Sequence, residues 1–83
     1  MYELRFSQEA VNQLNRLEHP LAKRIMKKLG EVRKDPHRHF KRLASSRESK
    51  LRIGDYRVIA LILEKESVIL VSLVGHRKNI YKK

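Results

Sequence analysis

The segment from residue 50 to residue 63 reads KLRIGDYRVIALIL and has the features of a β-hairpin. Apolar and polar residues alternate up to Gly54-Asp55, a dipeptide typical of tight turns. Residues 56–63 are then rich in β-branched side chains, which favour extended strands. These features predict two antiparallel strands, residues 50–53 and 56–63, joined by a two-residue turn.

The sequence after this hairpin extends the sheet. Residues 64–67 are polar and predict a second turn, and residues 68–74 are apolar and predict a third strand. Gly75 interrupts the apolar run, and a short basic tail follows from residue 76 to residue 83. This half of the chain therefore predicts an antiparallel meander.

The sequence before the hairpin predicts one strand and two helices. Residues 2–6 alternate as a half-buried strand does, and Ser7 can cap the helix that follows. Apolar residues then recur at helical spacing up to residue 34, with Pro20 tolerated at the start of a second helix. Residues 35–49 are polar and basic and predict an ordered loop. We expect one α+β domain spanning residues 1–83, with an N-terminal strand, a helical hairpin packed on a three- to four-stranded antiparallel sheet, and a short C-terminal helix or tail.

The two long strands carry apolar residues on both faces. Val58, Ala60 and Ile62 alternate with a second apolar set that begins at Ile59. An antiparallel sheet with one face in water alternates more cleanly between apolar and polar residues. A helical hairpin covers one face, so the C-terminal tail or another chain must cover part of the other.

The charge balance points to a polyanionic partner. The chain has 20 Lys and Arg against nine Asp and Glu, a formal net charge of +11 and a pI near 10.5. Between Lys23 and Arg57 there are thirteen basic residues and four acidic ones, a local net charge of +9. Such a surface attracts nucleic acid and makes its binding dependent on salt.

Composition also limits the possible functions. No cysteine is present, which excludes a disulfide framework and a thiolate zinc site. His37 and His39 lack a neighbouring carboxylate cluster, so we expect no metal and no cofactor. The longest apolar run is too short to span a membrane and no signal peptide opens the chain, so we expect a cytoplasmic protein without a membrane partner.

Five polar side chains can converge on one face of the predicted sheet. Side chains two apart on a strand point to the same side, and the turn brings the second long strand alongside the first. The five residues are Lys50, Arg52, Arg57, Arg77 and Tyr81. Guanidinium groups bind phosphates through paired hydrogen bonds and stabilise the additional charge of a transition state. We therefore predict phosphodiester chemistry at this face.

Two motifs resemble the RelE/ParE toxin superfamily. Residues 50–59, KLRIGDYRVI, resemble its central signature, and residues 74–81, VGHRKNIY, resemble the terminal motif of its RelE branch. The predicted order of elements is also similar. The resemblance implies a type II toxin: a ribosome-dependent endoribonuclease that cuts mRNA in the ribosomal A site. It also implies metal-independent attack by a 2′-hydroxyl, and an acidic, RelB-like antitoxin as partner beside the ribosome and mRNA.

The resemblance implies a role for each residue. Arg57 and Arg77 would stabilise the transition state, Tyr81 would orient or deprotonate the 2′-hydroxyl, and Lys50 would assist proton transfer. Arg52 stands where RelE-type enzymes often have lysine, and a guanidinium is a poor proton donor at neutral pH. Further cations are expected to bind RNA: Lys41, Arg42, Arg47, His76 and Lys78.

Three alternatives remain open from the sequence. His76 can replace the missing proton donor, or it can be an ordinary surface histidine. The chain can belong to the ParE branch, which inhibits DNA gyrase, although Arg77 and Tyr81 argue against that branch. It can also be a catalytically degenerate module that binds RNA or the ribosome through the same cations.

Overall fold

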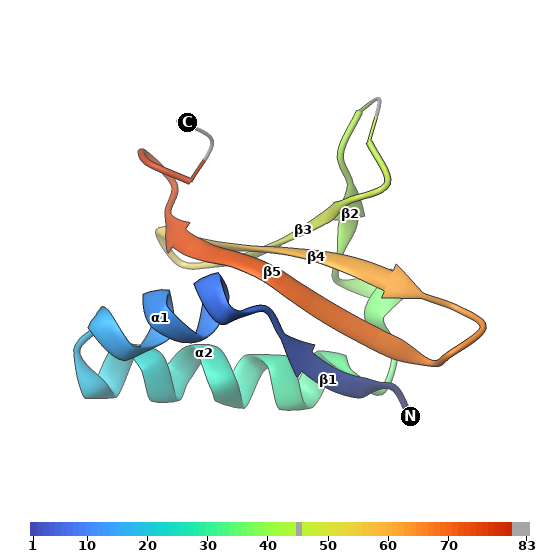
Figure 1. The fold of residues 1–83 in the computed structure, drawn as a ribbon, viewed down its shortest axis with the longest axis horizontal. Coiled ribbons are helices and arrows are strands. Elements are labelled where there is room, and N and C mark those ends of the chain that lie inside the picture. Colours follow the sequence, from blue (N-terminus) through green and yellow to red (C-terminus); the bar gives the residue numbers. More distant parts are fainter. Residues whose placement is uncertain (45, 81–83) are drawn as a thin grey trace.

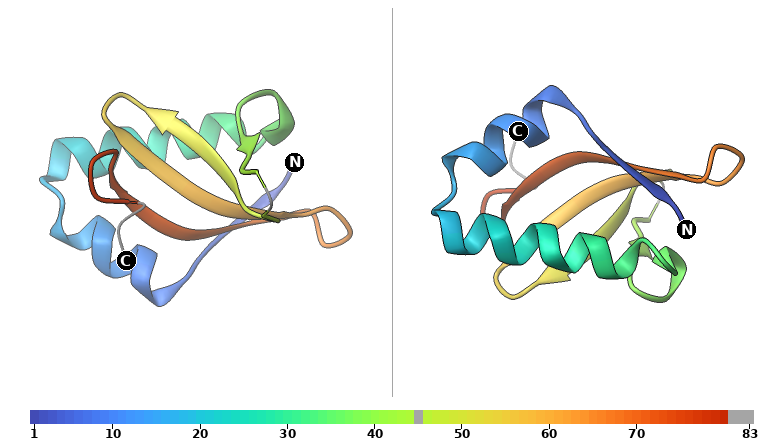
Figure 2. Two further views of the ribbon diagram at one scale, coloured as in Figure 1. Left: turned by 90° about the horizontal axis from the view of Figure 1, so that it is seen from above. Right: turned by 90° about the horizontal axis from the view of Figure 1, so that it is seen from below.

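The computed structural model describes residues 1–44 and 46–80, which form two helices and a five-stranded sheet (Figure 1). The elements in chain order are β1 (Glu3–Phe6), α1 (Gln8–Arg16), α2 (His19–Val32), a 3-10 helix (Pro36–Arg38), β2 (Lys41–Arg42), β3 (Ser49–Ile53), β4 (Tyr56–Leu63) and β5 (Val68–His76). Both helices lie on one face of the sheet (Figure 2). No helix in the described ranges is long and apolar enough to cross a bilayer.

The strand order is β1-β5-β4-β3-β2. The α+β class and the helical hairpin are as predicted, but the sheet has five strands and is mixed, because β1 pairs with β5 in parallel. A parallel pair needs a long connection, and the helices and three strands between β1 and β5 supply it. The fifth strand is β2, which lies inside the segment expected to be a loop. Two residues are too short to show an alternating pattern.

Helix α1 begins where the sequence predicts and also completes the edge of β5. The Ser7 hydroxyl accepts a hydrogen bond from the Ala10 backbone N–H at 3.1 Å and donates one to the Ser72 carbonyl at 2.9 Å. Beyond the end of β1, the Gln13 side-chain oxygen accepts from the Val74 N–H at 2.6 Å. Side chains of α1 thus satisfy backbone groups of β5 that no neighbouring strand reaches.

The main core lies between α2 and the sheet. Ile25, Leu29 and Val32 recur at helical spacing on α2 and are fully buried, as the apolar stripe predicts. They belong to one cluster with inward-facing strand residues such as Val58 and Val71. Burial of this kind provides most of the stability of a small domain.

The C-terminal turn packs on the other face of the sheet. The Ile80 N–H donates to the His76 carbonyl at 3.0 Å, which closes one turn of chain after β5. Ile80 is 8% exposed, and its Cδ1 lies 3.3 Å from the position that a Cβ on Gly75 would occupy. The turn therefore covers part of the face opposite the helices, one of the two possibilities that the apolar pattern leaves open.

Candidate active site

The sheet face opposite α1 and α2 is called the open face below, and the open face with the two segments that rise beside it is called the cradle (Figures 1 and 2). The C-terminal turn rises on one side of the open face and the loop between β2 and β3 on the other. Register partners in neighbouring strands share a face. Lys50 pairs with Ile59, and Ile59 with Leu73, so these three residues lie on the open face, outside the helix-facing core.

Arg57 and Arg77 both contact the β3–β4 turn. The Arg57 guanidinium donates to the Gly54 carbonyl at 2.9 Å and to the Tyr56 carbonyl at 3.0 Å. The Arg77 backbone N–H donates to the Asp55 carbonyl at 2.8 Å, and its Nε lies 3.8 Å from the Asp55 carboxylate. Gly54 has a φ of 59°, the left-handed conformation that a tight two-residue loop favours in glycine. One turn thus holds two guanidinium groups at the edge of the open face.

Lys50 continues this cationic group along the strand. It is half-buried and pairs with Lys41 of β2, so both lysines lie on the open face. Lys41 was predicted to bind RNA from a loop, whereas the structure places it in a strand beside Lys50. Five of the predicted site residues therefore share this face or its edge: Lys41, Lys50, Arg52, Arg57 and Arg77.

Arg52 lies on the open face, at the free edge of β3. It is the register partner of Arg57, but β2 pairs only with Ser49 and Lys50, which leaves the edge of β3 free at Arg52. Arg52 is exposed and lines a hollow with residues of α2, among them Arg24 and Lys27. Its register puts it on the same face as Lys50 and Arg57, and at this free edge it also borders a second set of cations on α2.

His76 does not join the open face. It is the register partner of Tyr56, which packs against the helix-facing core, and the two rings meet edge to face with centroids 5.4 Å apart. Its Nδ1 accepts a hydrogen bond from the Lys78 backbone N–H at 3.1 Å. Arg57 pairs one position away and so points to the opposite side. This geometry favours a structural role for His76 over proton donation beside Arg57.

The remaining predicted residues lie around the rim of the cradle. Arg42 is exposed, and its Nε donates to the Ser46 carbonyl at 3.0 Å. Arg47 is exposed on the same loop, and Lys78 is exposed in the C-terminal turn. Tyr81, the predicted catalytic tyrosine, lies outside the described residues.

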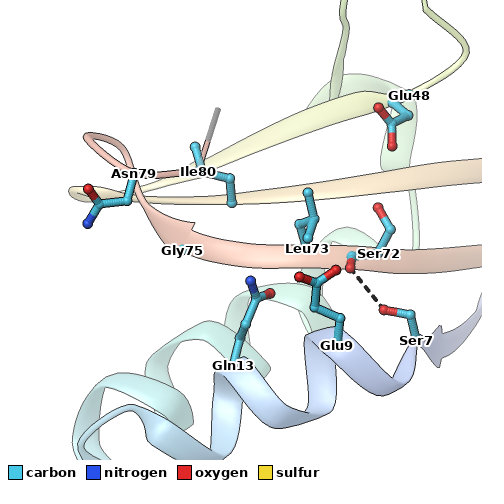
Figure 3. A pocket seen from close by; sticks show the side chains of 9 residues that line it. All are labelled: Ser7, Glu9, Gln13, Glu48, Ser72, Leu73, Gly75, Asn79 and Ile80. Carbon is cyan, nitrogen blue, oxygen red and sulfur yellow. Dashed lines mark hydrogen bonds between the residues drawn. The ribbon is translucent and has the colours of Figure 1, made fainter. Parts of the chain in front are cut away.

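A hollow of about 720 Å³ lies over β5 between the C-terminal turn and the β2–β3 loop (Figure 3). Its lining includes two carboxylates, Glu9 from α1 and Glu48 from the approach to β3. Glu48 is half-buried and extends toward Ser72 in Figure 3. Glu48 was not among the predicted site residues. It precedes β3 and lies two residues before Lys50, and residues two apart in extended chain point to the same side, so the sequence alone could have placed it beside Lys50. A carboxylate beside a phosphate-binding surface is a candidate proton acceptor.

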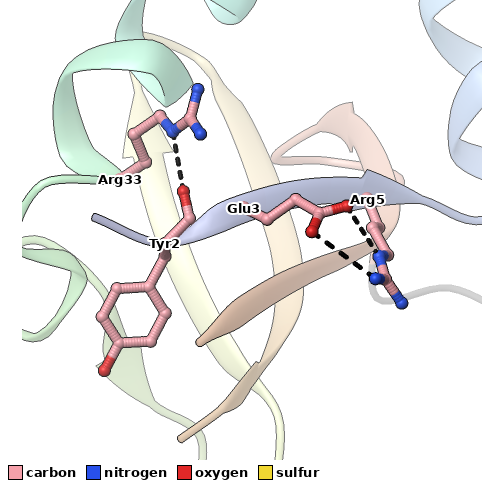
Figure 4. Close-up of polar contacts among 4 residues, drawn as sticks. All are labelled: Tyr2, Glu3, Arg5 and Arg33. Atoms are coloured by element: carbon pink, nitrogen blue, oxygen red, sulfur yellow. Dashed lines mark hydrogen bonds and ion pairs between the residues drawn. The ribbon is translucent and has the colours of Figure 1, made fainter. Parts of the chain in front are cut away.

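The N-terminal strand carries a separate set of polar contacts. Arg33 donates to the Tyr2 carbonyl at 2.7 Å, and Arg5 donates to Glu3 at 2.9 Å (Figure 4). The hydrogen bond from Arg5, helped by its charge, lowers the pKa of Glu3. The Arg33 contact anchors the start of β1 to the end of α2, and the Arg5–Glu3 pair lies within β1.

The turn between β4 and β5 is tied to the same end of the molecule. The Tyr2 hydroxyl donates to Glu64 at 2.8 Å, and His37 also contacts this carboxylate. The hydrogen bond from Tyr2, followed by that from His37, lowers the pKa of Glu64. His37 is thus engaged by an acidic side chain, and no group of three or more potential metal ligands occurs in residues 1–44 and 46–80.

The sequence and the fold agree on the class of protein. Residues 4–81 match the family model described as the ParE toxin of the type II toxin–antitoxin system parDE. The chain therefore belongs to this toxin family, and its predicted resemblance to the RelE/ParE superfamily is confirmed. None of the curated proteins compared matches the sequence significantly.

Several solved structures share the fold. The RelBE2 toxin–antitoxin complex of Mycobacterium tuberculosis matches with a TM-score of 0.83 and 23% identity over 94% of this chain and 93% of that one. The intact RelBE complex of E. coli matches with a TM-score of 0.79 and 23% identity over 92% and 96%. The RelB–RelE complex of Methanococcus jannaschii matches with a TM-score of 0.73 and 21% identity over 94% and 95%. These similarities establish a RelE-like fold.

Proposed function

We propose that this type II toxin is a ribosome-dependent endoribonuclease that cuts mRNA in the ribosomal A site. The observation that carries the proposal is that Arg57 and Arg77 both contact the β3–β4 turn, at the edge of a sheet face that neither helix covers. Two guanidinium groups at one edge can bind one phosphate and stabilise the charge that develops on it. Lys50 and Lys41 extend the positive field along the same face.

The proposed reaction needs no metal ion. The 2′-oxygen attacks the adjacent phosphorus, the bond from phosphorus to the 5′-oxygen breaks, and the products are a 2′,3′-cyclic phosphate and a 5′-hydroxyl. The proton of the 2′-hydroxyl goes to a base, and the departing 5′-oxygen gains a proton from an acid. Arg57 and Arg77 stabilise the phosphorane-like charge, and Lys50 assists proton transfer.

Two residues are candidates for the base that accepts the proton of the 2′-hydroxyl. Tyr81 is the candidate that the terminal motif implies, and it lies outside the described residues. Glu48 is a second candidate, because it lines the hollow and a carboxylate oxygen can accept a proton. Replacing each residue separately distinguishes the two.

We further propose that an acidic, RelB-like antitoxin covers the open face in the cytoplasm. Leu61, Leu70 and Leu73 are only half-buried there, beside the cations of the cradle. An amphipathic acidic segment matches both properties. The solved structures of similar fold include RelB–RelE complexes, which supports a partner of this kind.

The test is cleavage of a defined mRNA by the purified chain, with and without programmed ribosomes, with the 5′ ends mapped. We expect cuts only with ribosomes, at A-site codons, that are lost in Arg77→Ala. Loss in Tyr81→Phe but not in Glu48→Gln identifies the tyrosine as the base, and the reverse identifies the carboxylate. Because ribosomes need magnesium, metal independence is tested with EDTA on any residual cutting of naked RNA.

A second candidate is inhibition of DNA gyrase, since the matching family model is named for ParE. A supercoiling assay with purified gyrase separates the two functions. Inhibition of supercoiling without any mRNA cleavage would replace the endoribonuclease proposal. Ribosome binding without mRNA cleavage and without inhibition of gyrase would instead indicate a module that only binds RNA phosphates.

A further inference from the structure

Helix α2 carries a second cationic surface on the other side of the β3–β4 turn. This α2 cationic surface consists of Lys23, Arg24, Lys27, Lys28 and Arg52. Residues four apart on a helix lie about 6 Å apart along its axis, on the same side. Lys23 and Lys27 form one such pair and Arg24 and Lys28 another, so four cations cover two adjacent rows.

The β3–β4 hairpin joins this surface from the sheet. A hollow of about 410 Å³ lies between α2 and the end of β3, and Arg24, Lys27, Lys28 and Arg52 are among the residues that line it. The Arg24 guanidinium lies over Gly54, with its Nη2 3.1 Å from the position that a Cβ would occupy. Arg24 packs on the turn, and Arg52 lies at the free edge of β3. The cations of the helix and of the strand therefore border the same hollow. Figure 2 shows the turn beside α2.

In the described part of the chain, no carboxylate lies within ion-pair distance of these side chains. Within residues 1–44 and 46–80, the ion pairs involve Arg5, His37 and Arg77, and none involves a member of the α2 cationic surface. Glu31 is the single acidic residue that lines the hollow. Several unpaired cations in one hollow concentrate positive potential and attract the phosphates of a polyanion.

We propose that the α2 cationic surface binds the phosphate backbone of double-helical RNA. Proteins that bind single strands add aromatic side chains on which exposed bases stack, whereas no aromatic residue lines this hollow. Double-stranded RNA keeps its bases stacked inside and is recognised through phosphates and 2′-hydroxyls. A rigid helix with cations in two rows fits that target. The four helix cations lie away from the open face, and Arg52, the register partner of Arg57, borders both surfaces. Binding through the helix cations therefore goes beyond cleavage and does not depend on it.

Binding of a fluorescent RNA hairpin with a 16-base-pair stem tests the proposal, beside an unstructured RNA of equal length. We expect Lys27→Gln combined with Lys28→Gln to weaken hairpin binding about tenfold at 100 mM salt. The slope of log K against log salt should become shallower by about two, since each phosphate contact contributes about 0.9. Lys27→Arg combined with Lys28→Arg should retain the affinity.

The matched control removes the same charge elsewhere, in Arg5→Gln combined with Lys65→Gln, and should change binding less than twofold. Thermal melting of each variant verifies the fold. The proposal is overturned if the α2 variant matches this control, or if it loses affinity for unstructured RNA as strongly as for the hairpin. Unchanged hairpin binding with lost binding of a poly-glutamate peptide would overturn it in favour of an acidic protein partner. None of these readouts requires cleavage, so the two proposals fail independently.

Discussion

The two faces of the sheet have similar apolar content but different cover. On β4, Val58 and Ala60 face the helices and are completely buried. Leu61 and Leu63 face the other way and remain half-buried. Ile80 of the C-terminal turn shields part of this open face at Gly75.

The difference in cover assigns a different role to each face of the sheet: one stabilises the fold and the other binds a partner. The helix-facing residues complete a cluster that α2 closes with Ile25, Leu29 and Val32. The open face combines half-buried leucines with the lysines and arginines of the cradle, a mixture that suits an amphipathic or anionic partner. We therefore expect substitutions on the helix-facing side to change stability and substitutions on the open face to change function.

The largest expected effect is on the helix-facing side. Leu29→Ala removes a fully buried side chain and should lower the free energy of unfolding by about 3 kcal/mol or more. Leu70→Ala, the same change on the open face, should cost less than about 1.5 kcal/mol because the site is already half-exposed. Urea denaturation measures both values. Equal losses would show that the open face is as much a part of the core as the other.

The sequence predicts the hairpin because local chemistry decides it. The strand expected at residues 56–63 is found as β4, and Gly54 takes the left-handed conformation that the turn requires. The parallel pairing of β1 with β5 is a contact between distant parts of the chain, which no local pattern specifies. The pairing of β2 with β3 is too short to leave a pattern.

The candidate site is predictable in part for the same reason. Arg57 and Arg77 both contact one tight turn that the sequence already shows. His76 lies on the side away from Arg57, because a β-bulge adds Ser72 to β5 and reverses the alternation of residues after it. Arg52 pairs with Arg57, as the shared face predicts, but its position beside α2 was not predictable, since the free strand edge there is a property of the whole sheet.

The next largest effect concerns activity on the open face. Arg57→Ala should lower ribosome-dependent cleavage about 100-fold or more, or about 2.7 kcal/mol, through lost stabilisation of the transition state. Arg5→Ala removes an exposed cation outside the cradle and should change cleavage less than twofold. Because Arg57 also binds turn carbonyls, Arg57→Lys and urea denaturation test whether the turn has loosened. A stability loss that fully accounts for lost cleavage would contradict a direct role in catalysis.

A smaller effect tests the cover that the C-terminal turn provides. Gly75→Ala places a methyl group 3.3 Å from Ile80 Cδ1 and should cost about 1 kcal/mol as the turn is displaced. Gly30→Ala is the control: it lies in α2, and nothing would come within 4 Å of the new Cβ. That change should stabilise the protein by about 0.5–1 kcal/mol, because glycine is unfavourable inside a helix. Similar values for both substitutions would mean that Ile80 does not shield the open face.

The smallest effect concerns Glu64, which lies in the turn between β4 and β5 and is bound by Tyr2 at the start of β1. The hydrogen bond from Tyr2 lowers the pKa of Glu64 below its ordinary value of 4.5. A carboxylate with a lowered pKa in the folded state contributes stability above its unfolded pKa, and that contribution is lost as the pH falls through the folded pKa. Tyr2→Phe should therefore raise the pKa of Glu64, and its destabilising effect should be larger at pH 7 than at pH 3.

An NMR titration of the Glu64 carboxyl, with urea denaturation at both pH values, measures these changes. His37→Gln removes the weaker of the two hydrogen-bond contributions and should shift the pKa of Glu64 less than Tyr2→Phe does. Tyr2→Phe leaves the cations of the cradle unchanged, so ribosome-dependent cleavage at pH 7 should stay within twofold of the unmodified chain. His37 lines a hollow with Arg42 and Arg47, so His37→Gln serves only for the comparison of pKa shifts. Loss of cleavage in Tyr2→Phe without loss of stability would mean that a residue outside the open face affects activity. It would contradict the expectation that only substitutions on the open face change function.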